Sequence, residues 1–308
     1  MQREAQAQLR FSDERSALEE HESGDRFQTE TESLLRSRRF ATRGEEVAPL
    51  PSRADLPMQT LSAPTFPLLL GGNHRVRLAT STADVEAAQR LRFEVFNLEL
   101  NEGLDSAYLS GLDADRFDEC CEHLLVEDTR SGAVVGTYRL QTGQLAAANH
   151  GYYSAQEFDF APFEPIRCET VELGRACVHR EHRKLSVLNL LWRGIAIYAT
   201  ERRARYLIGC SSLTSQDGGA GLGMFEALRG EHLAEERFRT VPVGDYAICA
   251  DASATSRPSV PKLLRAYLSL GAKLCGPPAL DREFKTIDFL TLLDLRAVPD
   301  AVRNHFLG

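Results

Sequence analysis

The chain has 308 residues, a formal net charge of −8 and 43% hydrophobic residues, which is enough for one large or two small domains with a packed core. The acidic balance argues against a general nucleic-acid-binding protein, which would carry a basic domain. No apolar run reaches the roughly 18 residues that span a bilayer, and the polar first nine residues lack the apolar centre of a signal peptide. These features predict a cytoplasmic protein.

The seven cysteines are scattered, with no Cys-x-x-Cys pair and no His spacing of the zinc-site type. In an intracellular chain this pattern predicts reduced thiols that are mostly buried as small apolar side chains. His179 and His182 are three residues apart, but no Cys or carboxylate cluster completes a metal site around them. We therefore expect no metal centre.

Residues 1–57 differ in composition from the rest of the chain. They hold 9 Arg and 12 Asp+Glu with few β-branched residues, so they cannot bury enough apolar surface to offset the entropy of ordering. We expect a disordered charged arm over 1–57, a proline-marked linker over 58–73 and a folded domain over 74–308.

The first regular elements start at His74. Alternation over 75–79 predicts a half-buried strand, and Ser81 or Thr82 can cap a helix that runs to about Phe96. Strands are expected at 123–127 and 133–140, and Ser131-Gly132 between them predicts a hairpin.

The remaining elements alternate between strand and helix. A long strand is expected over 170–179, and a helix with one apolar face is expected over 186–203. The later predicted elements are a strand over 206–210, a helix over 223–233, a strand near Ala247, a helix over 260–270 and a strand over 286–295. This order predicts an α/β fold with a mixed sheet.

Charge is concentrated in four places where a core pattern should be apolar. They are Arg92–Phe96, Asp113–Asp118, Arg139 and Glu172–Arg175. In a strand, Glu172 and Arg175 would face opposite ways unless a bulge intervened, and Gly174 between them makes a bulge easy to form. The four segments indicate a functional site, although buried Arg–carboxylate pairs can also simply stabilise a fold.

In this order and spacing the four segments resemble the acyl-carrier-protein-dependent branch of the GNAT superfamily. That branch includes acyl-homoserine-lactone synthases, long-chain N-acyl amino acid synthases and the ornithine N-acyltransferases of ornithine-lipid synthesis. The matching residues are Arg92 and Phe96; Asp113, Asp115, Phe117 and Asp118; Gly136 with Arg139-Leu140; and Glu172-Leu-Gly-Arg175. Gly174 and Ala176 depart from the Ser and Phe of the lactone synthases. The resemblance implies a GNAT-like fold, with a central mixed, mostly antiparallel sheet and flanking helices.

Other segments are similar to the ornithine N-acyltransferase and hemolysin-like members in particular. They are Val178–Arg183, Leu191–Gly194, 261–273, Asp288-Phe289 and His305-Phe306. Residues 258–308 form an extension that the shorter lactone synthases lack. The resemblance implies transfer of a long-chain, plain or 3-hydroxy, fatty acyl group to the α-amino group of an amino acid, with ornithine favoured. A lactone-type signal synthase and a non-catalytic acyl-carrier or lipid-binding module remain alternatives.

The identity of the acyl donor is indicated by the lack of a glycine-containing loop. GNAT enzymes that use acetyl-coenzyme A place a glycine-containing loop before the helix that follows the long strand, where backbone amides bind the pyrophosphate. Here 183–189 contain no glycine, which favours the phosphopantetheine of acyl carrier protein as the donor and no permanently bound cofactor. Arg180, Arg183 and Lys184 would suit an acidic carrier, although a solvated helix face would look the same.

Acyl transfer from a thioester to an amine requires deprotonation of the amine, stabilisation of the thioester oxygen and close positioning of the reactants. Glu172 is the first candidate for a general base or amine-orienting carboxylate, Asp113 is the second, and Arg175 completes the expected catalytic set. We expect the rest to bind substrate or shape the site: Arg92, Asp115, Asp118, Arg139 and His123. For His123 a satisfied strand histidine is the alternative.

The expected partners are acyl carrier protein and the amino-acid acceptor, with no nucleic acid. The helix over 260–270 carries Leu263, Leu264, Tyr267 and Leu268 on one side. This side could line an acyl groove or contact the inner face of a membrane, and a core position is the ordinary alternative. A peripheral membrane contact is therefore left open.

Overall fold

The computed structural model describes residues 66–249 and 259–298. The predicted arm, the first part of the predicted linker and the last ten residues lie outside these ranges. Among the helices in the described ranges, none is long and apolar enough to cross a membrane.

One sheet organises the described residues, in the order β1-β2-β3-β4-β5-β6-β9-β7, with β8 also paired to β9. Neighbouring strands are antiparallel except for β5 and β6. The strands are β1 (Leu69–Gly71), β2 (His74–Leu78), β3 (Glu122–Asp128), β4 (Val134–Thr142), β5 (Thr170–Val178), β6 (Tyr206–Leu213), β7 (Lys273–Leu274), β8 (Ala279–Asp281) and β9 (Thr286–Asp294). This arrangement confirms the mixed, mostly antiparallel sheet that the sequence predicted.

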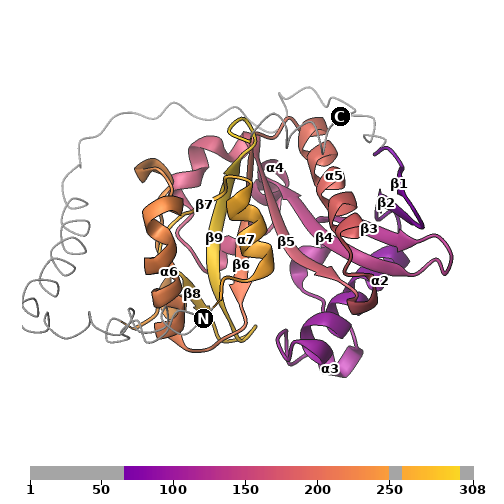
Figure 1. Cartoon of the computed structure of the whole chain (residues 1–308), viewed down its shortest axis with the longest axis horizontal. Helices are drawn as coiled ribbons and strands as arrows, with labels where there is room; N and C mark the ends of the chain where they lie inside the picture. Colours follow the sequence, from indigo (N-terminus) through magenta and orange to yellow (C-terminus); the bar gives the residue numbers. More distant parts are fainter. Residues whose placement is uncertain (1–65, 250–258, 299–308) are drawn as a thin grey trace, which may run out of the picture. The chain divides into compact units, whose positions relative to one another are not determined.

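Helices cover both faces of the sheet (Figure 1). The α-helices are α2 (Thr82–Arg92), α3 (Ala107–Ser110), α4 (Gly143–Ala148), α5 (Leu185–Glu201), α6 (Gly218–His232) and α7 (Lys262–Ser269). A π-helix, η1 (Phe93–Glu99), continues α2, and the 3₁₀ helices are η2 (Arg116–Glu119), η3 (Tyr153–Gln156), η4 (Ala161–Glu169), η5 (Arg180–His182), η6 (Glu236–Phe238) and η7 (Gly244–Tyr246).

Alternation along the strands separates two environments. On β9, Ile287 and Phe289 pack with α6 and α7, whereas Leu290 and Leu292 face the opposite cluster. On β5, Val171 and Leu173 join the core under α5, and Glu172 between them faces the other side. A charged residue at such a position therefore enters the layer opposite α5, where the polar site lies.

The pairing of β5 with β6 is short. It covers only Thr170–Glu172 against Tyr206–Ile208, although both strands continue well beyond it. The strands therefore part after Glu172, and the edge of β5 beyond that residue has no strand partner on the β6 side. The opening lies in the middle of the sheet.

Three predicted elements differ from the observed ones. The end of the predicted linker forms β1, which pairs with β2 through a turn where Gly72 has a φ of +61°. Helix α6 begins at Gly218 instead of about 223, because Asp217 caps it and the absent side chain of Gly221 lets the helix approach Ile287. The strand expected near Ala247 is wrong: Ala247 makes one isolated bridge, with Ala279.

The residues assigned to an extension are part of the same sheet. Residues 259–298 supply α7, β7, β8 and β9, and β9 lies between β6 and β7. Leu264, Tyr267 and Leu268 of α7 are buried, as expected for an ordinary core helix.

Gly209 of β6 packs against the backbone of Leu173 in β5 with no room for a side chain, so we expect Gly209→Ala to destabilise the fold. An added Cβ would lie 2.2 Å from the Leu173 carbonyl oxygen, a backbone atom that cannot move aside alone. The expected loss is about 1–3 kcal/mol in the free energy of unfolding, measured by urea denaturation. Gly174→Ala is the matched control, because no heavy atom lies within 4 Å of its added Cβ. Equal stability of the two variants would contradict this account of the β5–β6 junction.

Candidate active site

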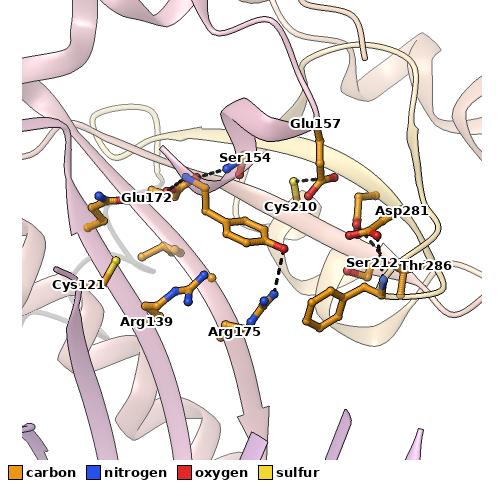
Figure 2. Close-up of a pocket in the computed structure, with 16 residues that line it drawn as sticks. Cys121, Arg139, Ser154, Glu157, Glu172, Arg175, Cys210, Ser212, Asp281 and Thr286 are labelled. Carbon is orange, nitrogen blue, oxygen red and sulfur yellow. Dashed lines mark hydrogen bonds between the residues drawn. The ribbon is translucent and has the colours of Figure 1, made fainter. Parts of the chain in front are cut away.

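A polar cavity of about 70 Å³ lies where β5 and β6 part (Figure 2). This volume accommodates several waters or a small polar group. Of the predicted site residues, Arg139, Glu172 and Arg175 line it. A smaller apolar cavity of about 20 Å³ opens on the other face of the same junction, lined by Trp192 of α5 and Tyr267 of α7 among others. Leu173 and Cys210 border both cavities.

The bulge expected in β5 is present. Arg139 of β4 lies opposite Gly174 and Thr137 lies opposite Cys177, so β5 has one residue more than its partner over this stretch. Arg175, not Gly174, takes the left-handed backbone conformation, with a φ of +50°. The bulge explains why Glu172 and Arg175, three residues apart, line one cavity. A left-handed backbone at a non-glycine residue costs free energy and is often found at functional sites.

Glu172 is almost fully buried and receives two backbone hydrogen bonds. Its carboxylate oxygens accept from the Tyr153 and Ser154 amides, each at 2.8 Å. Burial raises the pKa of Glu172, and the two amide donors partly offset that increase. The carboxylate therefore holds the start of η3 over the cavity, and its pKa is moved towards the range that suits a base.

Arg92 is the centre of a buried ion-pair network beside the cavity. Its guanidinium contacts Asp118 at 2.6 Å and Asp113 at 2.9 Å, and it also donates to the Asp113 carbonyl. Gln89 donates a further hydrogen bond to Asp118 at 3.0 Å. Asp113 itself does not line the cavity, so its geometry favours a positioning role.

Asp115 connects this network to the cavity wall. It accepts from Arg139 at 2.6 Å and from Arg175 at 2.9 Å. Burial opposes ionisation of Asp115 and Asp118, but the adjacent guanidinium groups outweigh it and hold the pKa of each carboxyl below its ordinary value. Arg139 and Arg175 are thereby fixed as cations at the cavity.

Arg175 is also held between two aromatic rings. Its guanidinium carbon lies 4.8 Å from the centre of the Tyr153 ring and 3.9 Å from that of Phe284, and it donates to the Tyr153 hydroxyl at 3.3 Å. Tyr153 and Phe284 could not be identified as site residues from the sequence, because aromatic residues in irregular segments have no distinctive pattern.

His123 is buried behind this wall and does not line the cavity. Its Nε2 lies 3.3 Å from the carbonyl oxygen of Asp118, and burial lowers its pKa. A neutral histidine packed under the ion-pair network is the role that this geometry favours.

The three residues expected to dock the carrier protein lie on the surface between β5 and the start of α5. Arg180, Arg183 and Lys184 are all exposed. Arg183 pairs with Glu99 through bonds of 2.5 and 2.8 Å, whereas neither Arg180 nor Lys184 has an ion pair with the residues the structure describes. Arg180 and Lys184 are therefore the better docking candidates.

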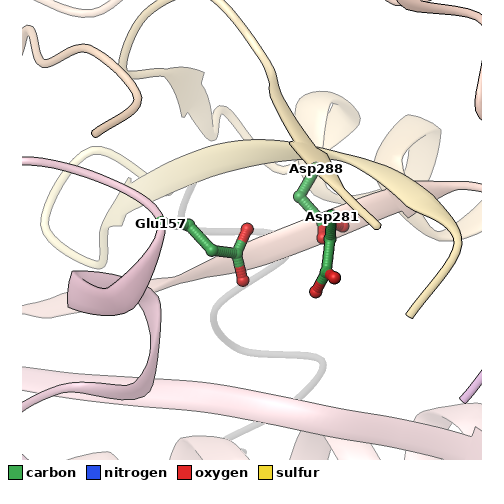
Figure 3. Close-up of side chains that lie close together, drawn as sticks. All are labelled: Glu157, Asp281 and Asp288. Carbon is green, nitrogen blue, oxygen red and sulfur yellow. The ribbon is translucent and has the colours of Figure 1, made fainter. Parts of the chain in front are cut away.

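Sequence reasoning missed an acidic group in the same layer. Glu157, Asp281 and Asp288 are buried, and one ligand atom from each lies within 4.8 Å of the others (Figure 3). Burial, reinforced by the neighbouring carboxylates, raises the pKa of Glu157 well above its ordinary value and that of Asp288 to about 6. Asp288 could have been recognised from the sequence as a candidate site residue, because it is an acidic residue in an otherwise apolar strand. In donor type, this group could bind a divalent cation or an ammonium.

Asp288→Asn should stabilise the unliganded protein at pH 8. Its folded pKa of about 6 lies above the unfolded value near 4, so the ionised form opposes folding above pH 6, and stability returns as pH falls towards 4. Removing the charge should add about 1–2 kcal/mol at pH 8 and little at pH 4. Chemical denaturation at the two pH values measures this difference. A variant less stable than the parent at pH 8 would contradict the assignment.

Comparison with known proteins gives consistent matches. The family model described as an acetyltransferase (GNAT) domain matches residues 91–193. The L-ornithine N(alpha)-acyltransferase of Agrobacterium fabrum is 31% identical over 253 residues, which cover 77% of this chain and 86% of that protein. The protein of the same name from Brucella abortus is 33% identical over 256 residues, covering 78% and 91%.

Solved structures are more distant. FeeM, an N-acyl amino acid synthase from uncultured soil microbes, aligns with a TM-score of 0.43 and 11% identity, covering 73% of this chain and 92% of that one. The acyl-homoserine-lactone synthase LasI aligns with a TM-score of 0.43 and 12% identity, covering 72% and 90%. Similarity at this level bears on neither substrate nor mechanism.

Proposed function

Since the chain belongs to the GNAT N-acyltransferase family, together with the L-ornithine N(alpha)-acyltransferases, we propose that it transfers a long-chain fatty acyl group, plain or 3-hydroxylated, from acyl carrier protein to the α-amino group of ornithine. The thioester bond to the carrier's phosphopantetheine breaks and an amide bond forms. The amine loses its proton, and the carrier leaves as the thiol.

The observation that carries the proposal is the parting of β5 and β6 between a polar and an apolar cavity. A thioester placed at this junction would meet the unpaired edge of β5, whose backbone amides can stabilise the developing oxyanion. The acyl chain would extend towards Trp192 and Tyr267, and the amino acid would occupy the polar side. In this arrangement the apolar side excludes water from the acyl chain, and the polar side admits water beside the amine of the acceptor.

The polar cavity supplies what the acceptor requires. Glu172 takes the amine proton, directly or through a water, and Arg139 or Arg175 attracts the acceptor carboxylate. Asp113, Asp115, Asp118 and Arg92 position those arginines without reaching the substrate.

A reconstituted reaction tests the activity and the donor together. The full-length protein is incubated with ornithine and either acyl carrier protein or coenzyme A carrying the same acyl chain, and N-acyl product is measured by mass spectrometry. The proposal predicts a kcat/KM at least tenfold higher for the carrier-protein donor. A preference for coenzyme A would overturn the donor assignment, and absence of N-acyl product with both donors would overturn the activity.

Reversing the charge of the proposed docking surface should weaken carrier binding. The double variant Arg180→Glu/Lys184→Glu is expected to raise KM for acyl carrier protein about tenfold at low salt, with less effect on kcat, because both side chains are exposed cations. Lys262→Glu on α7 is a control for reversing one exposed cation elsewhere on the surface. Equal KM values for the double variant and the control would place the docking surface elsewhere.

A further inference from the structure

Glu157, Asp281 and Asp288 are an unusual group because they are buried without forming an ion pair with any described residue. Their exposed fractions are 2%, 4% and 4%, and none of the three forms an ion pair with a Lys, Arg or His among the described residues. Buried carboxylates are normally paired or bind a metal, because an uncompensated charge is costly to desolvate. The group therefore lacks a cationic partner that a ligand could supply.

Three separate elements bring the carboxylates to one end of the polar cavity (Figures 2 and 3). Asp288 lies on β9 opposite Ser212 of β6, Asp281 ends β8 opposite Thr286, and Glu157 follows η3. All three line the cavity that also contains Glu172 and Arg175. The acidic group is thus within the site proposed for the acceptor.

Local hydrogen bonds orient all three carboxylates without satisfying the whole group, and Glu157 accepts only a weak one, from Cys210 Sγ at 3.8 Å. Asp281 Oδ1 accepts from the amides of Glu283 and Phe284, both at 2.8 Å, and Asp288 Oδ2 accepts from Thr286 at 3.1 Å. The other oxygen of Asp288 accepts no hydrogen bond from the described residues, although the side chain is buried. A ligand that donates a hydrogen bond to this oxygen would satisfy it.

A complementary unsatisfied group lines the same cavity. Arg139 is 3% exposed, and its Nη2 has no acceptor among the residues the structure describes. The cavity thus has an unsatisfied acceptor oxygen, on Asp288, on one wall and an unsatisfied guanidinium N–H group, on Arg139, on another. A ligand carrying both an ammonium and a carboxylate would satisfy both.

We propose that Glu157, Asp281 and Asp288 form a subsite for the side-chain ammonium of a diamino-acid acceptor and so select acceptors that carry this second cation. This inference rests on the proposed function, because it assigns one end of the acceptor within that site. An alkylammonium presents three N–H donors, which matches three converging carboxylates. A divalent cation could use the same oxygens, but it would leave the unsatisfied guanidinium unexplained.

Ornithine and norvaline separate this role from general activity, because norvaline has the same carbon chain without the side-chain amine. The full-length enzyme should show a kcat/KM for ornithine at least 100-fold above that for norvaline. In Asp288→Asn and Glu157→Gln this ratio should fall to about 5 or less. The exposed Asp245→Asn is the control and should keep the wild-type ratio. Thermal melting identifies any variant that does not fold.

The same pair of ligands gives a binding test that does not depend on turnover. Calorimetry of the wild-type protein should show tighter binding of ornithine than of norvaline, and Asp288→Asn should abolish the difference. The subsite would be overturned by equal binding of the two ligands or by a wild-type kcat/KM ratio of ornithine to norvaline near one. An equal loss of kcat/KM for both acceptors in the variants would also overturn it. Loss of activity on chelation, restored by Mg²⁺ or Mn²⁺, would overturn it in favour of a metal site. A wild type that binds ornithine selectively but acylates no amino acid would refute the proposed function and retain the subsite.

Discussion

Glu172→Gln is expected to lower kcat about 10²- to 10⁴-fold, the usual contribution of a general base. The carboxylate lines the polar cavity at the point where β5 leaves β6, and burial raises its pKa. In the parent enzyme kcat/KM should fall as pH drops through that raised pKa, because only the ionised form accepts a proton. The variant should lack this limb of the pH profile.

The structural role of Glu172 must be separated from the catalytic one. Glutamine keeps one acceptor for the Tyr153 and Ser154 amides and turns a donor towards the other, at a cost of about 1–3 kcal/mol. Denaturation reports that cost independently of rate. Glu164→Gln, on the exposed face of η4, controls for loss of a carboxylate and should leave kcat unchanged. A variant with reduced stability and the pH profile of the parent would assign Glu172 to loop positioning alone.

Arg92→Met is expected to reduce the free energy of unfolding by about 3–5 kcal/mol, the range found when one partner of a buried ion pair is removed. Arg92 is fully buried, and its loss would leave Asp118 and Asp113 without their nearest cation. Methionine fills much of the volume, so most of the loss comes from removing one of the two cations that pair with each carboxylate. Urea denaturation at pH 7 measures it.

The matched control for this prediction is Arg167→Met. Arg167 pairs with Glu164 near the surface, with side-chain exposures of 25% and 50%, so its removal should cost at most about 1 kcal/mol. If Arg92→Met were no more destabilising than Arg167→Met, the network would not be the structural support of Arg139 and Arg175 described above.

Most elements of the fold could be predicted because their patterns are local. The alternation of β3 and β4, the Ser81 cap of α2 and the apolar face of α5 each correspond to an observed element. The early start of α6 could not be predicted, because packing against the sheet overrides the weak helix propensity of residues such as Gly219. The π-helix η1 could not be predicted either, since its residues have no pattern that distinguishes it from a continued α-helix. At Ala247 the error is the opposite one: a strand was predicted from local propensity, but the residue makes only a single bridge because no partner strand lies beside it.

In the candidate site, too, some residues could be predicted from the sequence and others could not. Glu172 and Arg175 were identifiable because charges stood in an apolar strand, and Gly174 indicated the bulge that places them together. Asp288 carried the same signal in β9, but Asp288-Phe289 indicated only a family resemblance and no role in the site. Glu157 and Asp281 lie outside long strands, so only the tertiary structure places them beside Asp288.

Mass spectrometry of lipid extracts from a host expressing the full chain, beside the Glu172→Gln variant, tests the central claim most directly. The account predicts a new amide-linked acyl-ornithine species that depends on the parent protein and falls by at least 100-fold in the variant. Its mass and fragmentation would identify the acceptor and the acyl chain in one measurement. Extracts without any new N-acylated amino acid, from cells that contain the folded protein and ornithine, would contradict the proposed function.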